Sequence, residues 1–210
     1  MKNRSYLVIG LGRFGSAVAT ALAEQGMQVL AIDRSMDAVE AHRSRLTDVV
    51  RGDAMDESVL KQLGVSDFDA AIITMGDDVK ASSVITMHLK ELGVKYVIAK
   101  AADDFHGRML TRLGADKVIF PERDMGRRVA HNLVSEKIMD FIELSPDYSL
   151  MEMRPRPEWI GTPLKELNLR GRHRINVVAV RSGEKVDAMP DPDTVLSADD
   201  VMLVVSGAEK

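Results

Sequence analysis

The chain has 210 residues, of which 45% are hydrophobic and 29% are charged, and this composition is typical of a folded globular protein. A formal net charge of −4 argues against a nucleic-acid polymer as partner, because such partners need a basic surface. The absence of Cys excludes disulfides, thiol catalysis and cysteine-based zinc sites. With neither a signal-peptide core nor an apolar run of about 20 residues, we expect a cytosolic protein without direct membrane insertion.

The first 120 residues alternate short β-rich runs with segments of helical period. This alternation predicts an α/β domain over residues 1–121, with a Rossmann-like, doubly wound parallel sheet. Ser35 and Asp56 are the residue types that begin helices, and glycines stand where helices should end. The six predicted strands are Tyr6–Ile9, Val29–Ile32, Val49–Arg51, Ala70–Thr74, Tyr96–Ala99 and Val118–Phe120.

A helical stretch is predicted next, from Asp124 to about Ile142, within a linker segment of residues 122–144. Val129 and Leu133 belong to an apolar stripe at a spacing of four, so one face of this helix should pack against another surface. The pattern leaves two interpretations open, a last Rossmann helix on its own sheet or a helix that crosses to a partner subunit.

Residues 145–210 are expected to form a second, smaller unit. Apolar β-branched runs at Ile175–Val180 and Val201–Val205, a short helix at Pro163 to Leu167 and a turn at Ser182-Gly183 predict a β-rich α+β subdomain. At about 65 residues such a unit is near the lower limit for independent stability, so we expect it to dimerise.

A glycine-rich loop, Gly10-Leu11-Gly12-Arg13-Phe14-Gly15, joins the first predicted strand to the first helix. In this context the three glycines allow a tight turn, a close approach of backbone to phosphate, and close packing of helix on strand. Asp33 ends the second predicted strand, where a carboxylate can bind ribose hydroxyls and repel the 2′-phosphate of NADP, although Arg34 lies beside it. The alternative is that the glycines only shape a turn and Asp33 caps a loop.

Further residues follow the other predicted strands at the same edge of the sheet. Ligands of open α/β sheets bind outside the carboxyl ends of the strands, so we predict that these residues line the nucleotide site. The ordinary alternatives are a loop acid for Asp53, a solvated charge for Lys100 and an acid at the start of a helix for Glu122. The predicted residues are Asp53 and Ala54 after the third strand, Thr74, Met75 and Gly76 after the fourth, Lys100 at the end of the fifth and Glu122 after the sixth.

The second unit lacks an evident acid–base group for a dehydrogenase, so we predict a binding protein rather than an enzyme. Its one histidine, His173, stands among arginines, and neighbouring cations disfavour a general base and favour anion binding. The other histidines fall on predicted helices, where solvated positions are expected: His42, His88, His106 and His131.

Three motifs resemble those of the RCK (KTN) regulatory subunits of Ktr and Trk potassium transporters, the KtrA type above all. They are Val8–Gly15, Gly52-Asp53-Ala54 with Glu57-Ser58-Val59-Leu60 behind it, and Phe120-Pro121-Glu122-Arg123-Asp124-Met125-Gly126. The resemblance covers nearly the whole chain. It implies a cytosolic subunit that forms dimers and then an octameric ring, and that attaches peripherally to the membrane through a potassium-transporter subunit. It also implies that the helix around Val129 to Phe141 crosses over between subdomains within a dimer.

The resemblance further implies a ligand and residue roles. ATP would favour the conducting state of the transporter and ADP the inactive one. Arg13 and Lys100 would contact phosphate, Asp33 and Asp53 the ribose and adenine end, and Glu122 a divalent cation, Mg²⁺ or Ca²⁺, beside the ATP phosphates. From the residues alone, NAD or NADH is also compatible with the loop. The alternative function is therefore an NAD(H)-binding redox sensor or a short Rossmann-type oxidoreductase.

A basic segment in the second unit indicates a second ligand. Arg170, Arg172, His173 and Arg174 concentrate positive charge in an otherwise acidic chain, which suits a phosphate, whereas a solvated basic hairpin is the alternative. By the resemblance, this ligand would be cyclic di-AMP at a dimer interface, although Arg174 replaces a small residue of the relatives. The matching positions are Arg170, His173, Ile175, Asn176 and Pro190.

Overall fold

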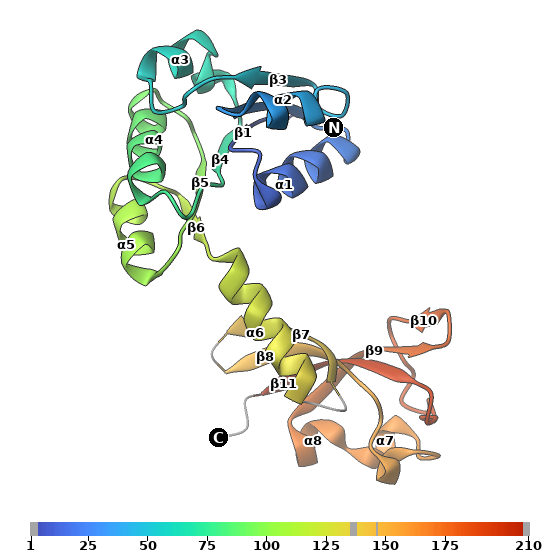
Figure 1. The fold of residues 1–210 in the computed structure, drawn as a ribbon. Coiled ribbons are helices and arrows are strands. Elements are labelled where there is room, and N and C mark those ends of the chain that lie inside the picture. The colour runs from blue at the N-terminus through green and yellow to red at the C-terminus, as the bar shows by residue number, and fades with distance from the viewer. Residues whose placement is uncertain (1–3, 135–137, 146, 208–210) are drawn as a thin grey trace. The chain divides into compact units, whose positions relative to one another are not determined.

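The computed structural model of the chain describes residues 4–134, 138–145 and 147–207. It divides into two compact units, residues 1–121 and residues 122–210, each with its own sheet (Figure 1). Within the described ranges, no helix combines the length and the apolar character that a membrane span requires.

The first unit is built on a six-stranded parallel sheet with the strand order β3-β2-β1-β4-β5-β6. The order reverses between β1 and β4, and the crevice at such a switch point is where open α/β sheets bind ligands. All six predicted strands are confirmed, each to within one residue at either end. They are β1 (Ser5–Ile9), β2 (Gln28–Asp33), β3 (Asp48–Arg51), β4 (Ala70–Ile73), β5 (Val97–Lys100) and β6 (Lys117–Ile119).

Helices cover both faces of this sheet because its strands are apolar on both sides. Along β1, Leu7 and Ile9 pack in one core cluster with Leu60 and Ile85, whereas Val8 packs in a second cluster on the opposite face. The first cluster contains side chains of α3, α4 and α5, and the second contains side chains of α1 and α2. The helical segments are α1 (Arg13–Glu24), α2 (Met36–His42), α3 (Glu57–Gln62), the 3₁₀ turn η1 (Val65–Asp67), α4 (Val79–Glu91) and α5 (Asp104–Arg112).

The helix predicted as far as Ile142 is shorter than expected. Helix α6 spans Pro121–Val134, and β7 (Ile138–Ser145) is a strand paired with β8 (Tyr148–Met153), so the prediction is wrong from residue 138 onward. Residues 135–137 of the predicted helix lie outside the described ones. An apolar spacing of four also satisfies the two-residue period of a strand, and antiparallel pairing with β8 decides between them.

The second unit contains a five-stranded antiparallel sheet with the order β10-β9-β11-β8-β7. Its core includes Trp159, Ile175 and Met202. The β-rich α+β character predicted for this part of the chain is confirmed, including both apolar runs, the short helix and the turn at Gly183. Its other elements are η2 (Pro157–Trp159), α7 (Leu164–Leu167), α8 (Leu169–His173), β9 (Ile175–Ser182), β10 (Lys185–Asp187) and β11 (Val201–Gly207).

Candidate functional site

Two glycines of the loop after β1 are required by the packing of the loop itself. Gly10 has a φ of +95°, and a β-carbon there would lie 2.7 Å from Thr74 Oγ1. A β-carbon on Gly15 would lie 1.9 Å from the carbonyl oxygen of Gly10, which no side chain can avoid. Gly12 differs, since apart from its own neighbours in the chain no described atom lies within 4 Å of the β-carbon it would carry. The space beside Gly12 is therefore open to a ligand.

Among the described helices α1 to α5 of this unit, only α1 has no side chain that caps its N-terminus. Gly12 occupies the cap position, and the first turn contains no acid but begins with the exposed Arg13. Uncapped N–H groups and the helix dipole make such an end favourable for an anion. The starts of α2 to α5 are capped by Ser35, Asp56, Asp78 and Asp103.

Asp33 ties the end of β2 to the glycine loop. Its Oδ2 accepts a hydrogen bond of 2.6 Å from the backbone N–H of Leu11, and its Oδ1 accepts one of 2.8 Å from Ser35 N. The loop-capping interpretation is thus part of its role. Each carboxylate oxygen has a second lone pair, so Asp33 can still accept hydrogen bonds from ribose hydroxyls.

Arg34 and Asp53 face each other at the ends of β2 and β3. Arg34 Nη1 lies 4.0 Å from Asp53 Oδ2, and both side chains are about half exposed, so this ion pair is weak and either partner can turn to a ligand. Asp53 Oδ1 also accepts a hydrogen bond from Met55 N. The neighbouring Ala54 is buried in the core, which leaves only its backbone for a ligand.

Thr74 supports the glycine loop from β4. Its buried hydroxyl lies 3.0 Å from the carbonyl oxygen of Ile9 and 2.9 Å from that of Gly10, and it can donate to either. Met75 packs against the core cluster that contains Leu7 and Ile9. Both residues therefore shape the loop, and neither offers a free polar group at the sheet edge.

Lys100 lies buried at the end of β5, with only 8% of its surface exposed. Its aliphatic chain passes over Gly76, where a β-carbon would lie 3.0 Å from Lys100 Cε. Its ammonium nitrogen stands 6.0 Å from the centroid of the Phe14 ring, in the first turn of α1. The Lys100 side chain therefore lies between Gly76 and Phe14, with its ammonium group near the start of α1, the helix end that favours an anion.

The first unit therefore brings together all of the predicted nucleotide-site residues except Glu122. Glu122 belongs to the second unit and lies in the first turn of α6. An acid at this position is also stabilised by the helix dipole. Its role as a cation ligand remains a prediction.

One expectation about histidines is wrong. His106 is buried, and its Nδ1 accepts a hydrogen bond from Ala102 N, so its Nε2 carries the proton and donates to Ser82 Oγ at 2.9 Å. Burial lowers the pKa of His106 below its usual value. The signal in the sequence was the helical spacing of His106 and the apolar Leu110, both of which face the core. His42 and His88 are partly buried, and the side chain of His131 lies outside the described residues.

The second unit has a cavity of about 310 Å³ beside α8. Four of the five residues predicted for a second ligand line it, namely Arg170, Ile175, Asn176 and Pro190. His173 is not among the described residues that line it, and its ring packs against Trp159 with ring centroids 5.3 Å apart.

Comparison with known proteins matches residues 6–121 to the TrkA-N domain and residues 150–209 to the TrkA-C domain. The chain is 40% identical over 202 residues to Ktr system potassium uptake protein C of Bacillus subtilis (strain 168), covering 96% of this chain and 91% of that protein. It is 35% identical to Ktr system potassium uptake protein A of Vibrio alginolyticus, covering 99% and 94%.

The fold is also similar to solved structures. The GsuK RCK domain has a TM-score of 0.69 at 18% identity. The match covers 98% of this chain but only 45% of the GsuK chain. The TrkA-N domain of inner membrane protein ybaL from Escherichia coli has a TM-score of 0.57 at 24% identity, covering 64% of this chain and 98% of that one. With both domains matched in order, the chain belongs to the Ktr potassium uptake protein family, with an N-terminal TrkA-N domain and a C-terminal TrkA-C domain.

Proposed function

We propose that this protein is a cytoplasmic regulatory subunit of a Ktr-type potassium uptake system, and that it binds ATP or ADP at the switch point of its six-stranded sheet. The observation that carries the proposal is the uncapped start of α1, with its open space at Gly12 and the ammonium of Lys100 over Phe14. These groups suit a polyphosphate, and Asp33 suits the ribose.

The relatives support a nucleotide but not one nucleotide alone. GsuK has been solved bound to NAD and bound to ADP, and its fold is the one found here. An NAD(H)-binding redox sensor is therefore the second candidate. Unlike NAD, ATP has a terminal phosphate, and only contacts to that phosphate can make ATP and ADP favour different states of a regulator.

A binding role is favoured over catalysis by the positions of the histidines. His106 and Ser82 form a pair resembling a base and a nucleophile, but both are buried in the core, with exposures of 1% and 0%. His173 packs on Trp159. Both histidines thus have packing roles in their own units, and this supports a binding role over catalysis.

We further propose that Glu122 binds Mg²⁺ or Ca²⁺ together with the phosphates of ATP, since hard cations prefer carboxylate and phosphate oxygens. The substitution Glu122→Gln should reduce the effect of the divalent cation on ATP affinity and leave ADP affinity unchanged. An unaltered cation dependence would return Glu122 to a helix-start acid.

Assembly is proposed to use the exposed apolar stripe on α6. Met125, Val129 and Leu133 follow one another at a spacing of four, and they are 54%, 50% and 80% exposed in the single chain. Burying this stripe against a second copy would remove apolar surface from water, which favours a dimer. We propose that such dimers build an octameric ring that docks on the membrane subunit.

The cavity in the second unit is proposed to bind cyclic di-AMP. Arg170 offers a guanidinium for phosphate, Asn176 offers an amide, and Ile175 with Pro190 offers apolar surface for a base. Such a ligand would inactivate potassium uptake if it binds the inactive ring more tightly than the conducting one.

The nucleotide proposal is tested by mass spectrometry of nucleotides released from the purified protein, followed by calorimetric titration of ATP, ADP, NADH and NADPH. We expect ATP and ADP to bind with micromolar or better affinity and NADPH to bind weakly. Exclusive binding of NADH would instead favour the redox-sensor alternative.

A further inference from the structure

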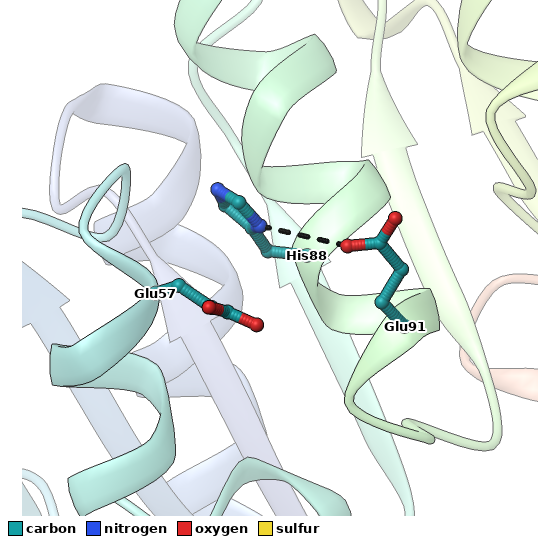
Figure 2. A group of neighbouring side chains, drawn as sticks. All are labelled: Glu57, His88 and Glu91. Atoms are coloured by element: carbon teal, nitrogen blue, oxygen red, sulfur yellow. Dashed lines mark ion pairs between the residues drawn. The ribbon is translucent and has the colours of Figure 1, made fainter.

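Three potential metal ligands from α3 and α4 converge on one face of the sheet of the first unit (Figure 2). Glu57 is the first residue of α3, and His88 and Glu91 lie in the last turn of α4. One ligand atom from each side chain lies within 4.8 Å of the ligand atoms of the other two. None of these three side chains belongs to the nucleotide site or to the cavity of the second unit.

The Nδ1 atom of His88 has an unusual environment. It is buried and has no hydrogen-bond partner. Within the described residues, every other buried side-chain nitrogen or oxygen has one. The nearest carboxylate oxygen, Glu91 Oε2, lies 3.9 Å away, which is too far for a hydrogen bond. A buried polar atom without a partner is unfavourable, so a group that occupies the space between the ring and the two carboxylates would satisfy it.

The surroundings of this atom favour a cation. Glu57 and Glu91 contribute two carboxylates, and the Asp56 carboxylate also interacts electrostatically with His88. Opposing them is Lys61, whose Nζ lies 2.9 Å from Glu57 Oε2. The side chain of His88 is only 18% exposed, whereas that of Glu91 is 60% exposed, so an ion can enter from the solvent side past Glu91.

The type of cation follows from the donors. One imidazole nitrogen with two carboxylate oxygens, and no sulfur, is a donor set that suits Zn²⁺ and related divalent transition metals. Mg²⁺ and Ca²⁺ prefer sites made of oxygen alone. Tetrahedral ligands of Zn²⁺ lie about 3.3 Å apart, so the 3.9 Å separation between His88 Nδ1 and Glu91 Oε2 must shorten, which rotation of the exposed Glu91 can provide.

We propose that Glu57, His88 and Glu91 bind a divalent transition-metal cation, with Zn²⁺ as the best fit and water as the fourth ligand. The cation would connect α3 to α4, whose residues Leu60 and Leu89 already share one core cluster. Because the segment from Asp53 to Glu57 leads directly from the nucleotide edge into α3, the bound cation would also restrain one border of that site.

The test is calorimetric titration of ZnCl₂ into the full chain without an affinity tag, with a thermal unfolding curve at each metal concentration. We expect one ion per chain and an unfolding temperature that rises with Zn²⁺, because the ion binds the folded state. His88→Gln and Glu91→Gln should each weaken Zn²⁺ binding by about tenfold or more, since even the loss of a residue that only hydrogen bonds to a metal ligand costs about 10- to 100-fold. MgCl₂ at the same concentrations should produce no comparable rise.

Two further variants make the result specific. His42→Gln removes a partly buried histidine whose Nδ1 is hydrogen bonded to Ala38 O, and it should leave Zn²⁺ affinity unchanged. Lys61→Gln frees Glu57 from its ion pair, so Zn²⁺ should bind several-fold more tightly. Unchanged affinity in His88→Gln, or equal losses in His88→Gln and His42→Gln, would overturn the proposal.

X-ray absorption at the zinc edge provides an independent measurement on the unmodified protein. We expect a first shell of nitrogen and oxygen with the outer-shell signal of a single imidazole. A zinc-loaded sample that lacks imidazole scattering would overturn the proposal even if His88→Gln proved unstable. None of these measurements depends on nucleotide, so the proposal and the proposed function can fail separately.

Discussion

Asp33 Oδ2 accepts a 2.6 Å hydrogen bond from the backbone N–H of Leu11, so the acid at the end of β2 holds the loop that follows β1. A ligand that binds the ribose side of Asp33 and the phosphate side of Gly12 would therefore contact one connected structure. Disturbing either end should alter nucleotide binding, whereas disturbing the packing of the loop should alter stability first.

Gly12→Asp should lower ATP and ADP affinity by about a hundredfold or more, because a carboxylate beside the phosphate approach repels the ligand. The fold should survive, because Gly12 has an ordinary φ of −66° and free space around it. Gly183→Asp is the control, since Gly183 lies in the turn after β9, has no described atom beyond its chain neighbours within 4 Å of its β-carbon, and has a φ of +61° that Asp tolerates better than most residues. Calorimetry that gives the same ATP affinity for Gly12→Asp and the unmodified chain would contradict the assignment.

Gly15→Ala should destabilise the first unit by about 3 kcal/mol, because the added methyl group overlaps the carbonyl of Gly10. Gly12→Ala, its neighbour in the same loop, should cost only about 1 kcal/mol or less, because its methyl group meets open space and the loss is that of a moderate N-cap residue replaced by a poor one. Urea unfolding followed by circular dichroism checks both. Equal stability of the two variants would show that the loop relaxes around Gly15.

His106 should make the protein less stable as the pH falls. Its pKa is lowered in the folded state by burial, so below its ordinary value of 6.5 the unfolded chain takes up a proton that the folded chain resists. The contribution is therefore fully present above pH 6.5 and is lost as the pH falls through the lower, folded-state pKa. Urea unfolding at a series of pH values should show a smaller loss in His106→Gln than in the unmodified chain, and the control His42→Gln should keep the full loss.

Leu133→Glu should weaken self-association without unfolding the chain, since Leu133 is 80% exposed and belongs to the apolar stripe on α6. Met189→Glu is the control, because Met189 is 91% exposed but lies off this stripe. Sedimentation equilibrium measures the association constant of each. If both variants associate as strongly as the unmodified chain, the stripe on α6 is not the dimer contact.

Arg170→Ala should lower cyclic di-AMP affinity by about tenfold or more, because a charge-assisted hydrogen bond to phosphate is lost. Arg172→Ala should have little effect, as Arg172 does not line the cavity. His173→Ala should have a smaller effect than Arg170→Ala for the same reason. Titration of cyclic di-AMP into the full chain gives all three values, and a result in which Arg170→Ala binds normally would favour the solvated-surface interpretation.

The sequence by itself determined the layout of the first unit. Strand positions were predicted to within one residue because continuous β-branched runs are buried on both faces of a parallel sheet. The glycine loop and Asp33 could be recognised from local spacing, since the turn and the helix start are made by neighbouring residues. Ser35 and Asp56 were identified as helix caps for the same reason.

The tertiary structure alone decided features that depend on distant partners. The segment from Ile138 became a strand because β8 supplies its hydrogen bonds, and its apolar spacing fits both periods. The helical spacing of His106 with Leu110 indicates its burial, but its hydrogen-bond partner Ser82 lies on α4, 24 positions away in the sequence. Glu57 and His88 stand on separate helices, and only the packing of α3 and α4 on one face of the sheet brings their ligand atoms within reach of one cation. Local periodicity contains no information about such pairs, because they form when elements far apart in the chain pack together.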